Sequence, residues 1–203
     1  MSQLPLPLLW PQEEGGERFI LSESNAAAAR HLERWSVWSL PITVLHGPRK
    51  SGRSTLGRLF VGKTKGILID DAWAADEEAL FHAWNDASAS RRPLLIVADA
   101  PPPAWRIALP DLASRLAASP SVGILDPDPP LIAALFEAQL ARRGLSVSPQ
   151  LIDWLQPRID RTHLAVLRAV DALDRAALSR QRGGLTIPFA REVLAEAGVI
   201  DAS

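Results

Sequence analysis

The feature that most constrains this chain is the segment GPRKSGRST at residues 47–55, which directly follows the apolar run PITVLH. It satisfies the pattern G-x-x-x-x-G-K-[ST] at every fixed position except one, where Arg53 stands in place of lysine. A glycine-rich turn between a strand and a helix directs several backbone N–H groups at one point, and the helix N-terminus adds partial positive charge. The segment, called the phosphate loop below, therefore predicts a phosphate-binding turn between a strand and a helix.

The whole phosphate loop is the candidate nucleotide-binding segment, and Ser54 is also a candidate ligand of Mg²⁺. Lysine would place a compact ammonium between the outer phosphates, whereas the longer planar fork of Arg53 reaches phosphate oxygens from a different point. With Arg53 in place of lysine, the loop can therefore still bind a nucleotide although the geometry needed to hydrolyse it is lost. A plain polar turn is the alternative. The candidate residues are Gly47, Pro48, Arg49, Lys50, Ser51, Gly52, Arg53, Ser54 and Thr55.

Acidic residues follow two further aliphatic runs. GILIDD at residues 66–71 ends with Asp70 and Asp71, and LLIVAD ends with Asp99. The carboxyl ends of parallel strands meet at one edge of a sheet, where ligands collect in open α/β folds. We therefore expect Asp70 to help hold Mg²⁺, Asp71 to polarise an attacking water, and Asp99 to orient water beside the terminal phosphate. The alternative for each is a carboxylate that caps the following turn.

Four short aliphatic runs, ITVLHG, GILIDD, RPLLIVAD and SVGILD, predict a parallel sheet. They lack polar alternation, as strands buried on both faces do. Helical segments lie between them, which indicates an α/β fold with both faces of the sheet covered. The expected helices include AAAARHLERW, capped by Ser24 or Asn25, and DEEALFHAWNDAS, capped by Asp76 with Leu80 and Trp84 on one face.

The character of the chain changes after DPDPP at residues 126–130, where strand-like runs stop and amphipathic helices begin. One of these helices is expected to begin at Asp160, and the last is expected to be capped by Thr186. The expected organisation is a flexible arm over residues 1–16, an α/β domain over 17–127 and a small helical domain over 128–203.

Composition excludes several classes of site. Cysteine is absent from the 203 residues, which removes disulfides and thiolate metal sites and fits a reducing compartment. The formal net charge of -1 gives no global attraction to nucleic acid or to an anionic membrane. The N-terminal segment has no basic start, and prolines interrupt its apolar run, so it predicts neither a signal peptide nor a membrane span. We therefore expect a cytoplasmic protein without direct DNA binding.

With these segments in place, the chain resembles the DnaA-related AAA+ ATPases, and most closely the Hda group of replication regulators. The matching segments cover most of residues 18–197 and include FILSESN, GPRKSGRS, GILIDDA, PLLIVADAPP, LPDLASRL and LDRAALSRQRGGLTIPFAREVL. The ending GRS is itself a feature of Hda-like phosphate loops. The resemblance implies an AAA+ sheet with a helical lid, bound ADP or ATP with Mg²⁺, and a negative regulator of replication initiation that promotes hydrolysis of DnaA-bound ATP.

The resemblance also assigns two interaction segments. LPDLASRL is similar to the segment that carries the arginine finger, which implies that Arg115 acts in trans on the nucleotide of DnaA; a surface arginine on a short helix is the alternative. QLPLPL at residues 3–8 resembles peptides that dock in the sliding clamp, and a disordered tail is the alternative. The implied partners are the clamp, DnaA and a second copy of the chain. The implied clamp anchors are Gln3, Leu4, Leu6 and Leu8.

The chain departs from the family pattern at two further places. Only residues 56–65 separate the phosphate loop from GILIDD, where the family usually has another strand and helix, so we expect about four strands and no DNA-contacting edge. Leu164 stands where the family carries the second sensor arginine of the lid. With Arg53, these departures imply weak or absent intrinsic ATP hydrolysis. The alternatives are a self-contained AAA+ ATPase acting as a loader or remodeller on DNA, a small-molecule kinase, and a nucleotide-free scaffold tethered to the clamp.

Overall fold

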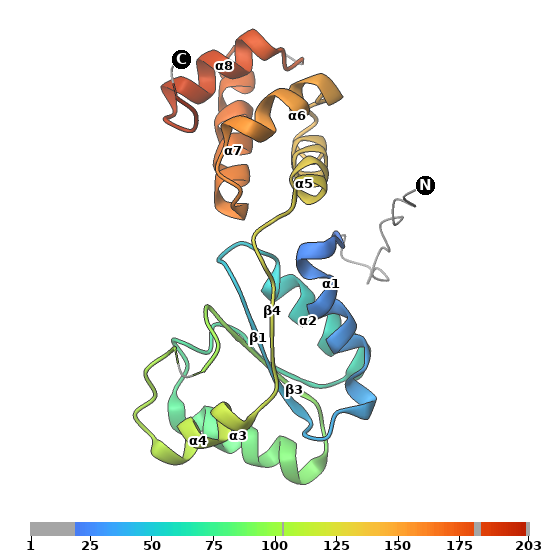
Figure 1. The fold of residues 1–203 in the computed structure, drawn as a ribbon, viewed down its shortest axis with the longest axis vertical. Helices are drawn as coiled ribbons and strands as arrows, with labels where there is room; N and C mark the ends of the chain where they lie inside the picture. Colours follow the sequence, from blue (N-terminus) through green and yellow to red (C-terminus); the bar gives the residue numbers. More distant parts are fainter. Residues whose placement is uncertain (1–18, 103, 181–183, 202–203) are drawn as a thin grey trace. The chain divides into compact units, whose positions relative to one another are not determined.

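The structure, a computed structural model, describes residues 19–102, 104–180 and 184–201. Its contacts divide the chain into two compact units, one up to Leu125 and the other from Asp126, at the start of the DPDPP segment (Figure 1). The helices of the described ranges include none with the length and hydropathy needed to cross a bilayer. The clamp-anchor predictions at Gln3, Leu4, Leu6 and Leu8 lie outside the described residues.

A parallel sheet forms the centre of the first unit, with the strand order β2-β3-β1-β4. Residues of β1 pair on both sides, with Val44 opposite Ile96 of β3 and opposite Ser121 of β4. Because every pair is parallel, the segments that follow β1, β2 and β3 leave from the same edge of the sheet. This confirms the α/β fold with four parallel strands. The strands are β1 (Ile42–His46), β2 (Ile67–Ile69), β3 (Leu94–Ala98) and β4 (Ser121–Gly123).

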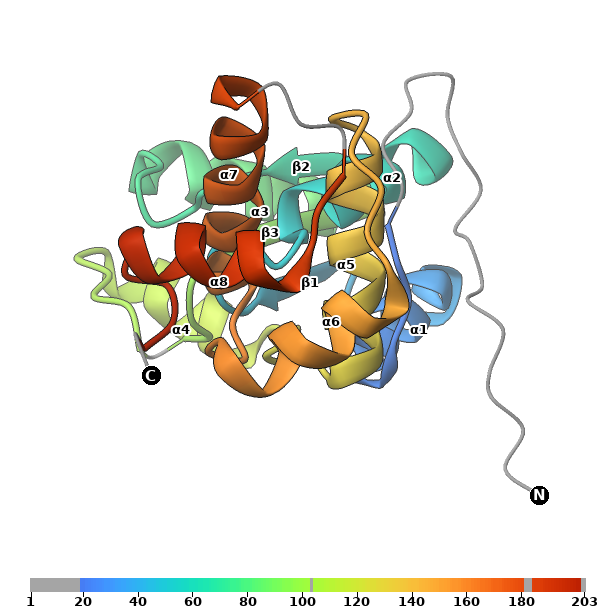
Figure 2. The same ribbon diagram turned by 90° about the horizontal axis from the view of Figure 1, so that it is seen from above.

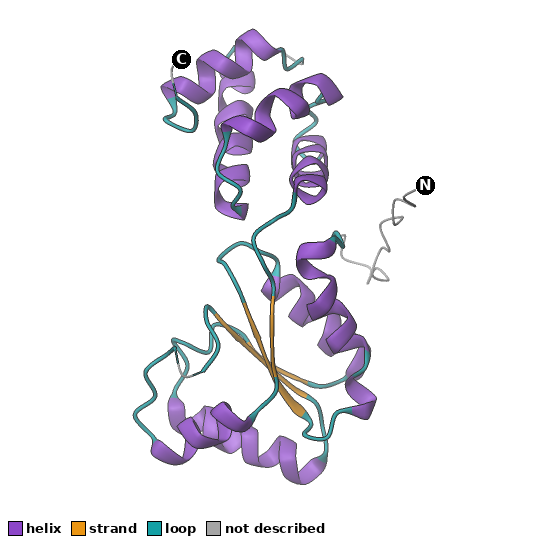
Figure 3. Ribbon diagram, viewed as in Figure 1, coloured by secondary structure: helices purple, strands orange, loops and turns teal. Residues whose placement is uncertain are grey.

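Helices cover both faces of this sheet (Figure 3). Alternate side chains of β3 divide between the faces: Leu95 lies in a core with residues of α1 and α2, and Ile96 lies in a core with residues of α3 and α4. Burial of both faces explains why the strand sequences are continuously apolar. The helices are α1 (Glu23–Glu33), α2 (Arg53–Thr64), α3 (Glu77–Ser90) and α4 (Pro110–Ala118), with a 3₁₀ turn η1 (Trp35–Val37) after α1.

Capping side chains mark the starts of α3 and α1 in this unit. The carboxylate of Asp76 accepts hydrogen bonds from the backbone N–H groups of Glu78 and Ala79, as the sequence predicted. At α1, however, the N-cap is Ser22, and the side chain of Asn25 accepts a hydrogen bond of 2.9 Å from the backbone N–H of Ser22. The expectation that Ser24 or Asn25 caps α1 is therefore wrong, because Asn25 occupies the reciprocal position three residues inside the helix.

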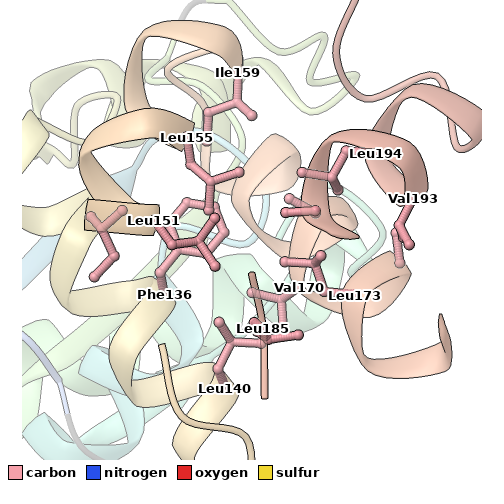
Figure 4. Packing of buried hydrophobic residues seen from close by; sticks show 14 of the residues in the cluster. Phe136, Leu140, Leu151, Leu155, Ile159, Val170, Leu173, Leu185, Val193 and Leu194 are labelled. Carbon is pink, nitrogen blue, oxygen red and sulfur yellow. The ribbon is translucent and has the colours of Figure 1, made fainter. Parts of the chain in front are cut away.

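The second unit is helical and has a single core of buried apolar residues, among them Phe136, Leu155 and Leu173 (Figure 4). Helix α7 contacts both α5 and α8, and α8 lies across α7 when the molecule is seen from above (Figure 2). The helices are α5 (Pro129–Ala141), α6 (Pro149–Leu155), α7 (His163–Ser179) and α8 (Ile187–Glu196), with a 3₁₀ turn η2 (Gln156–Arg158) after α6.

Threonine side chains cap the last two helices. Thr186 accepts a hydrogen bond from the backbone N–H of Phe189 at the start of α8, as predicted. Thr162 accepts one of 3.1 Å from the backbone N–H of Ala165, so α7 begins at His163. The expected start at Asp160 is wrong, because the carbonyl of Asp160 accepts a hydrogen bond from the backbone N–H of Thr162 in a tight turn that precedes the helix.

Candidate nucleotide-binding site

A cleft of about 430 Å³ lies at the edge of the sheet where β1, β2 and β3 end. Most of the phosphate loop lines it, together with the predicted acidic residues Asp70, Asp71 and Asp99. Val97 and Ala98 also line the cleft, and sequence reasoning missed them because an apolar strand residue carries no ligand signal. The loop residues outside the lining are Gly47, Pro48 and Ser51.

Two glycines allow the phosphate loop to take this course. Gly47 has φ 149°, and a Cβ atom there would lie 2.5 Å from the carbonyl oxygen of Ile124. Gly52 has φ 89° and is the N-cap of α2, where it places no side chain over the first N–H groups of the helix. These N–H groups have no acceptor within the helix. They point outward from the N-terminus of α2, where the helix dipole stabilises a bound anion. The loop therefore fits a bound phosphate group.

Ser54 and Asp70 form the pair that could hold a magnesium ion. The hydroxyl of Ser54 donates a hydrogen bond of 3.0 Å to Oδ1 of Asp70, so the first residues of α2 and the end of β2 meet in the cleft. Within the described ranges, no group of three or more His, Cys, Asp or Glu residues could hold a metal ion by itself. Mg²⁺ takes six oxygen ligands and usually keeps several waters. A hydroxyl and one carboxylate therefore fit a magnesium ion that is also bound to phosphate oxygens and water.

Arg53 is directed along the sheet edge toward the end of β3. Its guanidinium donates hydrogen bonds to the carbonyl of Ala98 and, at 2.7 Å, to Oδ1 of Asp99. Arg49 donates to Oδ2 of the same carboxylate at 2.8 Å, but its side chain is 74% exposed and that of Arg53 only 11%. The partly buried pair with Arg53 is therefore the stronger of the two interactions.

Asp99 is consequently the partner of both loop arginines, a role that sequence reasoning did not predict. The hydrogen bond from Arg53, together with the weaker effect of Arg49, lowers the pKa of Asp99 although burial acts in the opposite direction. The carboxylate is thus held in its charged form. Because Arg53 can donate to only a few oxygens at once, a phosphate group bound by the loop would compete with Asp99 for its guanidinium.

His46, the last residue of β1, is a further neighbour of the phosphate loop that the sequence did not single out. Its imidazole packs against Gly123, where a Cβ atom would lie 2.7 Å from Cε1 of the ring. Burial, and secondarily the positive charge of Arg53, lowers the pKa of His46. The ring is therefore neutral at physiological pH and adds no charge beside the loop.

Arg115, the predicted arginine finger, does not line the cleft. It lies on α4, and the central carbon of its guanidinium is 4.6 Å from the centroid of the Trp84 ring and 5.0 Å from that of Phe81. Leu164, at the position of the second sensor arginine, is 42% exposed on α7. Arg115 therefore does not belong to the group of side chains that line the cleft beside the phosphate loop.

Comparisons with known proteins concern the lid domain and the fold. Residues 131–194 match the family model described as Hda, lid domain. The fold resembles domain III from the Thermotoga maritima replication initiation protein DnaA, with a TM-score of 0.72 and 13% identity over 90% of this chain and 95% of that one. It also resembles AMPPCP-bound DnaA from Aquifex aeolicus, with a TM-score of 0.61 and 14% identity over 79% of this chain and 63% of that one.

A similarity of the same order extends to the Thermotoga maritima RuvB Holliday junction branch migration motor, with a TM-score of 0.63 and 12% identity over 88% of this chain and 68% of that one. At these identities the likeness to solved structures establishes the fold. The chain spans nearly all of the isolated domain III but less than two thirds of the Aquifex DnaA chain.

The family match covers one part of the molecule, whereas the fold similarity covers most of it. The match over residues 131–194 runs from α5 to α8 of the second unit. The first unit supplies the parallel sheet, and its phosphate loop leads into α2. Together they agree with the resemblance found in the sequence: residues 131–194 match the lid domain of Hda, and the chain has the fold of DnaA domain III.

Proposed function

We propose that this protein is a negative regulator of chromosomal replication initiation that binds the DNA polymerase sliding clamp and promotes hydrolysis of DnaA-bound ATP. The match of residues 131–194 to the Hda lid domain is the observation that carries the proposal. The likeness of the fold to domain III of a replication initiator supports the same process and DnaA as a partner. The protein would act in the cytoplasm, where the absence of cysteine suits a reducing environment.

The protein's own nucleotide would be ADP or ATP, bound by the phosphate loop with Mg²⁺ on Ser54 and Asp70. Two of the similar DnaA structures are described as bound to AMPPCP, which supports a nucleotide ligand here. The nucleotide would supply the phosphate oxygens that complete the magnesium site. Because Arg53 is engaged by Asp99 and the carbonyl of Ala98, we expect hydrolysis at this site to be weak or absent.

Arg115 is the residue that would act on DnaA. An arginine supplied by a neighbouring molecule stabilises the charge that develops on a transferred phosphoryl group. Arg115 lies outside its own chain's cleft, and among the described residues no carboxylate or carbonyl accepts a hydrogen bond from its guanidinium. Its N–H donors are therefore available to the nucleotide of a partner. Asp71 and Asp99 would act only at the protein's own site.

The test is the rate of DnaA-bound ATP hydrolysis in the presence of the sliding clamp. We expect Arg115→Ala to lower the stimulated rate by at least about 100-fold, since an arginine finger contributes about 10³–10⁵ in rate. Arg106→Ala is the matched control, because Arg106 is an exposed arginine in the segment just before α4. Equal stimulation by Arg115→Ala and the unaltered protein would rule out the finger mechanism.

Clamp binding is tested separately with the full chain and a variant lacking residues 1–8. We expect the truncated protein to lose binding to purified clamp, because Gln3, Leu4, Leu6 and Leu8 are the proposed anchors. The substitution Gln3→Ala should weaken binding without removing it. Equal clamp binding by the full and truncated chains would contradict the arm's role, whatever the outcome for Arg115. Gel filtration of the same samples would show whether the protein forms the homodimer implied by the resemblance.

A self-contained AAA+ ATPase that acts as a loader or remodeller on DNA is the second candidate. The contact between Ser54 and Asp70 favours it, because the magnesium pair is preserved in the protein's own cleft. This candidate predicts ATP turnover by the purified protein alone, stimulated by DNA and lost in Ser54→Ala. The first proposal predicts slow turnover that DNA does not change.

A further inference from the structure

One face of α3 is directed at α4, the helix that carries Arg115. Glu77, Phe81 and Trp84 are spaced at i, i+4 and i+7, so their side chains lie on the same side of α3. The carboxylate of Glu77 accepts hydrogen bonds of 2.9 and 2.8 Å from the backbone N–H groups of Ala108 and Leu109, where α4 begins. Phe81 and Trp84 contact Arg115 near the other end of α4. Helix α3 therefore holds α4 at both ends.

The indole of Trp84 makes a second link to the same arginine. Its Nε1 donates a hydrogen bond of 3.1 Å to the hydroxyl of Ser119, and that hydroxyl donates one of 2.8 Å to the backbone carbonyl of Arg115. Ser119 is buried. The ring beneath the guanidinium is thus fixed to the backbone from which the guanidinium extends.

Stacking and hydrogen bonding use different parts of a guanidinium. The flat faces stack on aromatic rings, whereas the five N–H donors lie in the plane of the group and point outward. Among the described residues, neither a carboxylate nor a carbonyl accepts a hydrogen bond from the guanidinium of Arg115. The rings can therefore restrict the side chain while its donors stay available.

We propose that Phe81 and Trp84 form an aromatic shelf that positions Arg115 for its action on a partner's nucleotide, an inference that rests on the function proposed above. A free arginine side chain samples many rotamers, and that freedom is lost when it contacts a phosphoryl group. The aromatic shelf removes part of this freedom in advance. Phe81 and Trp84 are thus positioning residues, which act through Arg115 without touching the nucleotide.

The rate test uses the full chain with DnaA-bound ATP and the sliding clamp. We expect Trp84→Leu to lower the maximum stimulated rate about fivefold, the factor that corresponds to a cation–π contact at a partly exposed site. The concentration giving half-maximal stimulation should change less than about twofold, because the aromatic shelf orients the finger and does not carry the docking of the two proteins. Trp84→Phe keeps a ring under the guanidinium and should recover most of the rate.

Two further variants separate positioning from folding. Phe81→Leu removes the other ring and leaves the hydrogen bonds of Trp84 and Ser119 in place, so it should lower the maximum rate. Because Phe81 is half-buried against the core, the thermal unfolding midpoint should fall only slightly. Trp73→Leu is the matched control, since it removes a half-exposed tryptophan of the same unit that does not contact Arg115, and it should leave the maximum rate unchanged.

A measurement without DnaA keeps this inference distinct from the proposed function. In the full chain labelled with ¹⁵N-arginine, the Nε–H signal of Arg115, identified by its loss in Arg115→Lys, should show a ring-current shift that Trp84→Leu reduces and that replacing both Trp84 and Phe81 with leucine removes. An Arg115→Ala defect with unchanged rates in Trp84→Leu and Phe81→Leu would overturn the aromatic shelf alone. Normal hydrolysis in Arg115→Ala would overturn both the arginine finger and the aromatic shelf. If the ring-current shift were still present in that case, the contact of Arg115 with Phe81 and Trp84 would serve only to stabilise the fold.

Discussion

At the scale of single residues, Gly47 is the position where the structure most directly opposes a substitution. A Cβ atom there would lie 2.5 Å from the carbonyl oxygen of Ile124, and φ is 149°. We expect Gly47→Ala to lower the free energy of unfolding by about 3–4 kcal/mol, the sum of backbone strain and overlap. Gly144→Ala is the control, since Gly144 has φ 71° but open space around it, and should lose only about 1–2 kcal/mol. Equal losses in urea unfolding would contradict the role of Ile124.

His163 makes stability depend on pH. Its side chain is buried, its Nδ1 has no hydrogen-bond partner among the described residues, and burial lowers its pKa below the ordinary 6.5, with Asp126 acting in the opposite direction. Below pH 6.5 the unfolded chain therefore takes up a proton that the folded chain does not. Stability should be fully present above pH 6.5 and should fall as the pH is lowered through the folded-state pKa.

The measurement is urea unfolding between pH 7.5 and 5.5, comparing the unaltered protein with His163→Leu. We expect the pH slope to become smaller in the variant. It should not vanish, because burial also lowers the pKa values of His31 and His46. An unchanged slope would show that His163 takes up its proton equally in the folded and unfolded chain.

The position of Arg53 could be predicted from the sequence, but its partners could not. The pattern around residues 47–55 placed Arg53 at the start of a helix, and it begins α2. Its contact with Asp99 depends on the pairing of β1 with β3, in which His46 lies opposite Ala98. The phosphate loop, which follows β1, therefore lies beside Asp99, which follows β3. Strand order is a property of the whole sheet, which no local pattern in the sequence contains.

At the scale of elements, Glu77 joins two helices that are separated in the sequence. Its carboxylate binds the backbone N–H groups of Ala108 and Leu109, which precede α4 and would otherwise lack an acceptor. We expect Glu77→Ala to lower the free energy of unfolding by about 1–3 kcal/mol, because charge-assisted hydrogen bonds are lost. Glu78→Ala is the control, because Glu78 is an exposed neighbour in the same turn. Equal effects of the two variants would show that the bridge to α4 contributes nothing to stability.

Helix starts show how far local patterns reach at this scale. Asp76 and Thr186 each stand just before an amphipathic run, and both cap the expected helix. Before α7 two candidates compete, and Thr162 becomes the cap because Asp160 belongs to a separate turn. The periodicity of the sequence predicted that α3, α7 and α8 exist. It could not predict the first residue of α7, because Asp160 and Thr162 are both residue types that cap helices and only their hydrogen bonds in the structure distinguish them.

At the scale of the whole molecule, the apolar cores of the two units share no residue. Phe60 lies in the core between the sheet and the helices α1 and α2 and is 1% exposed, while Phe136 lies in the core of the helical unit and is fully buried. A protein with two separate cores generally does not unfold in a single two-state transition. We therefore expect calorimetry of the full chain to show two transitions.

Two core variants and a ligand identify these transitions. Phe60→Ala and Phe136→Ala should each lower one of them, by about 3–5 kcal/mol, because each leaves a cavity in one core. Leu178→Ala is the control, since Leu178 is 73% exposed, and both transitions should stay within about 0.5 kcal/mol. Magnesium with ADP at about 100 times its Kd should raise the transition that Phe60→Ala lowers, by about 2.7 kcal/mol, because the phosphate loop belongs to that unit. A single transition lowered equally by both phenylalanine variants would mean that the two cores unfold as one.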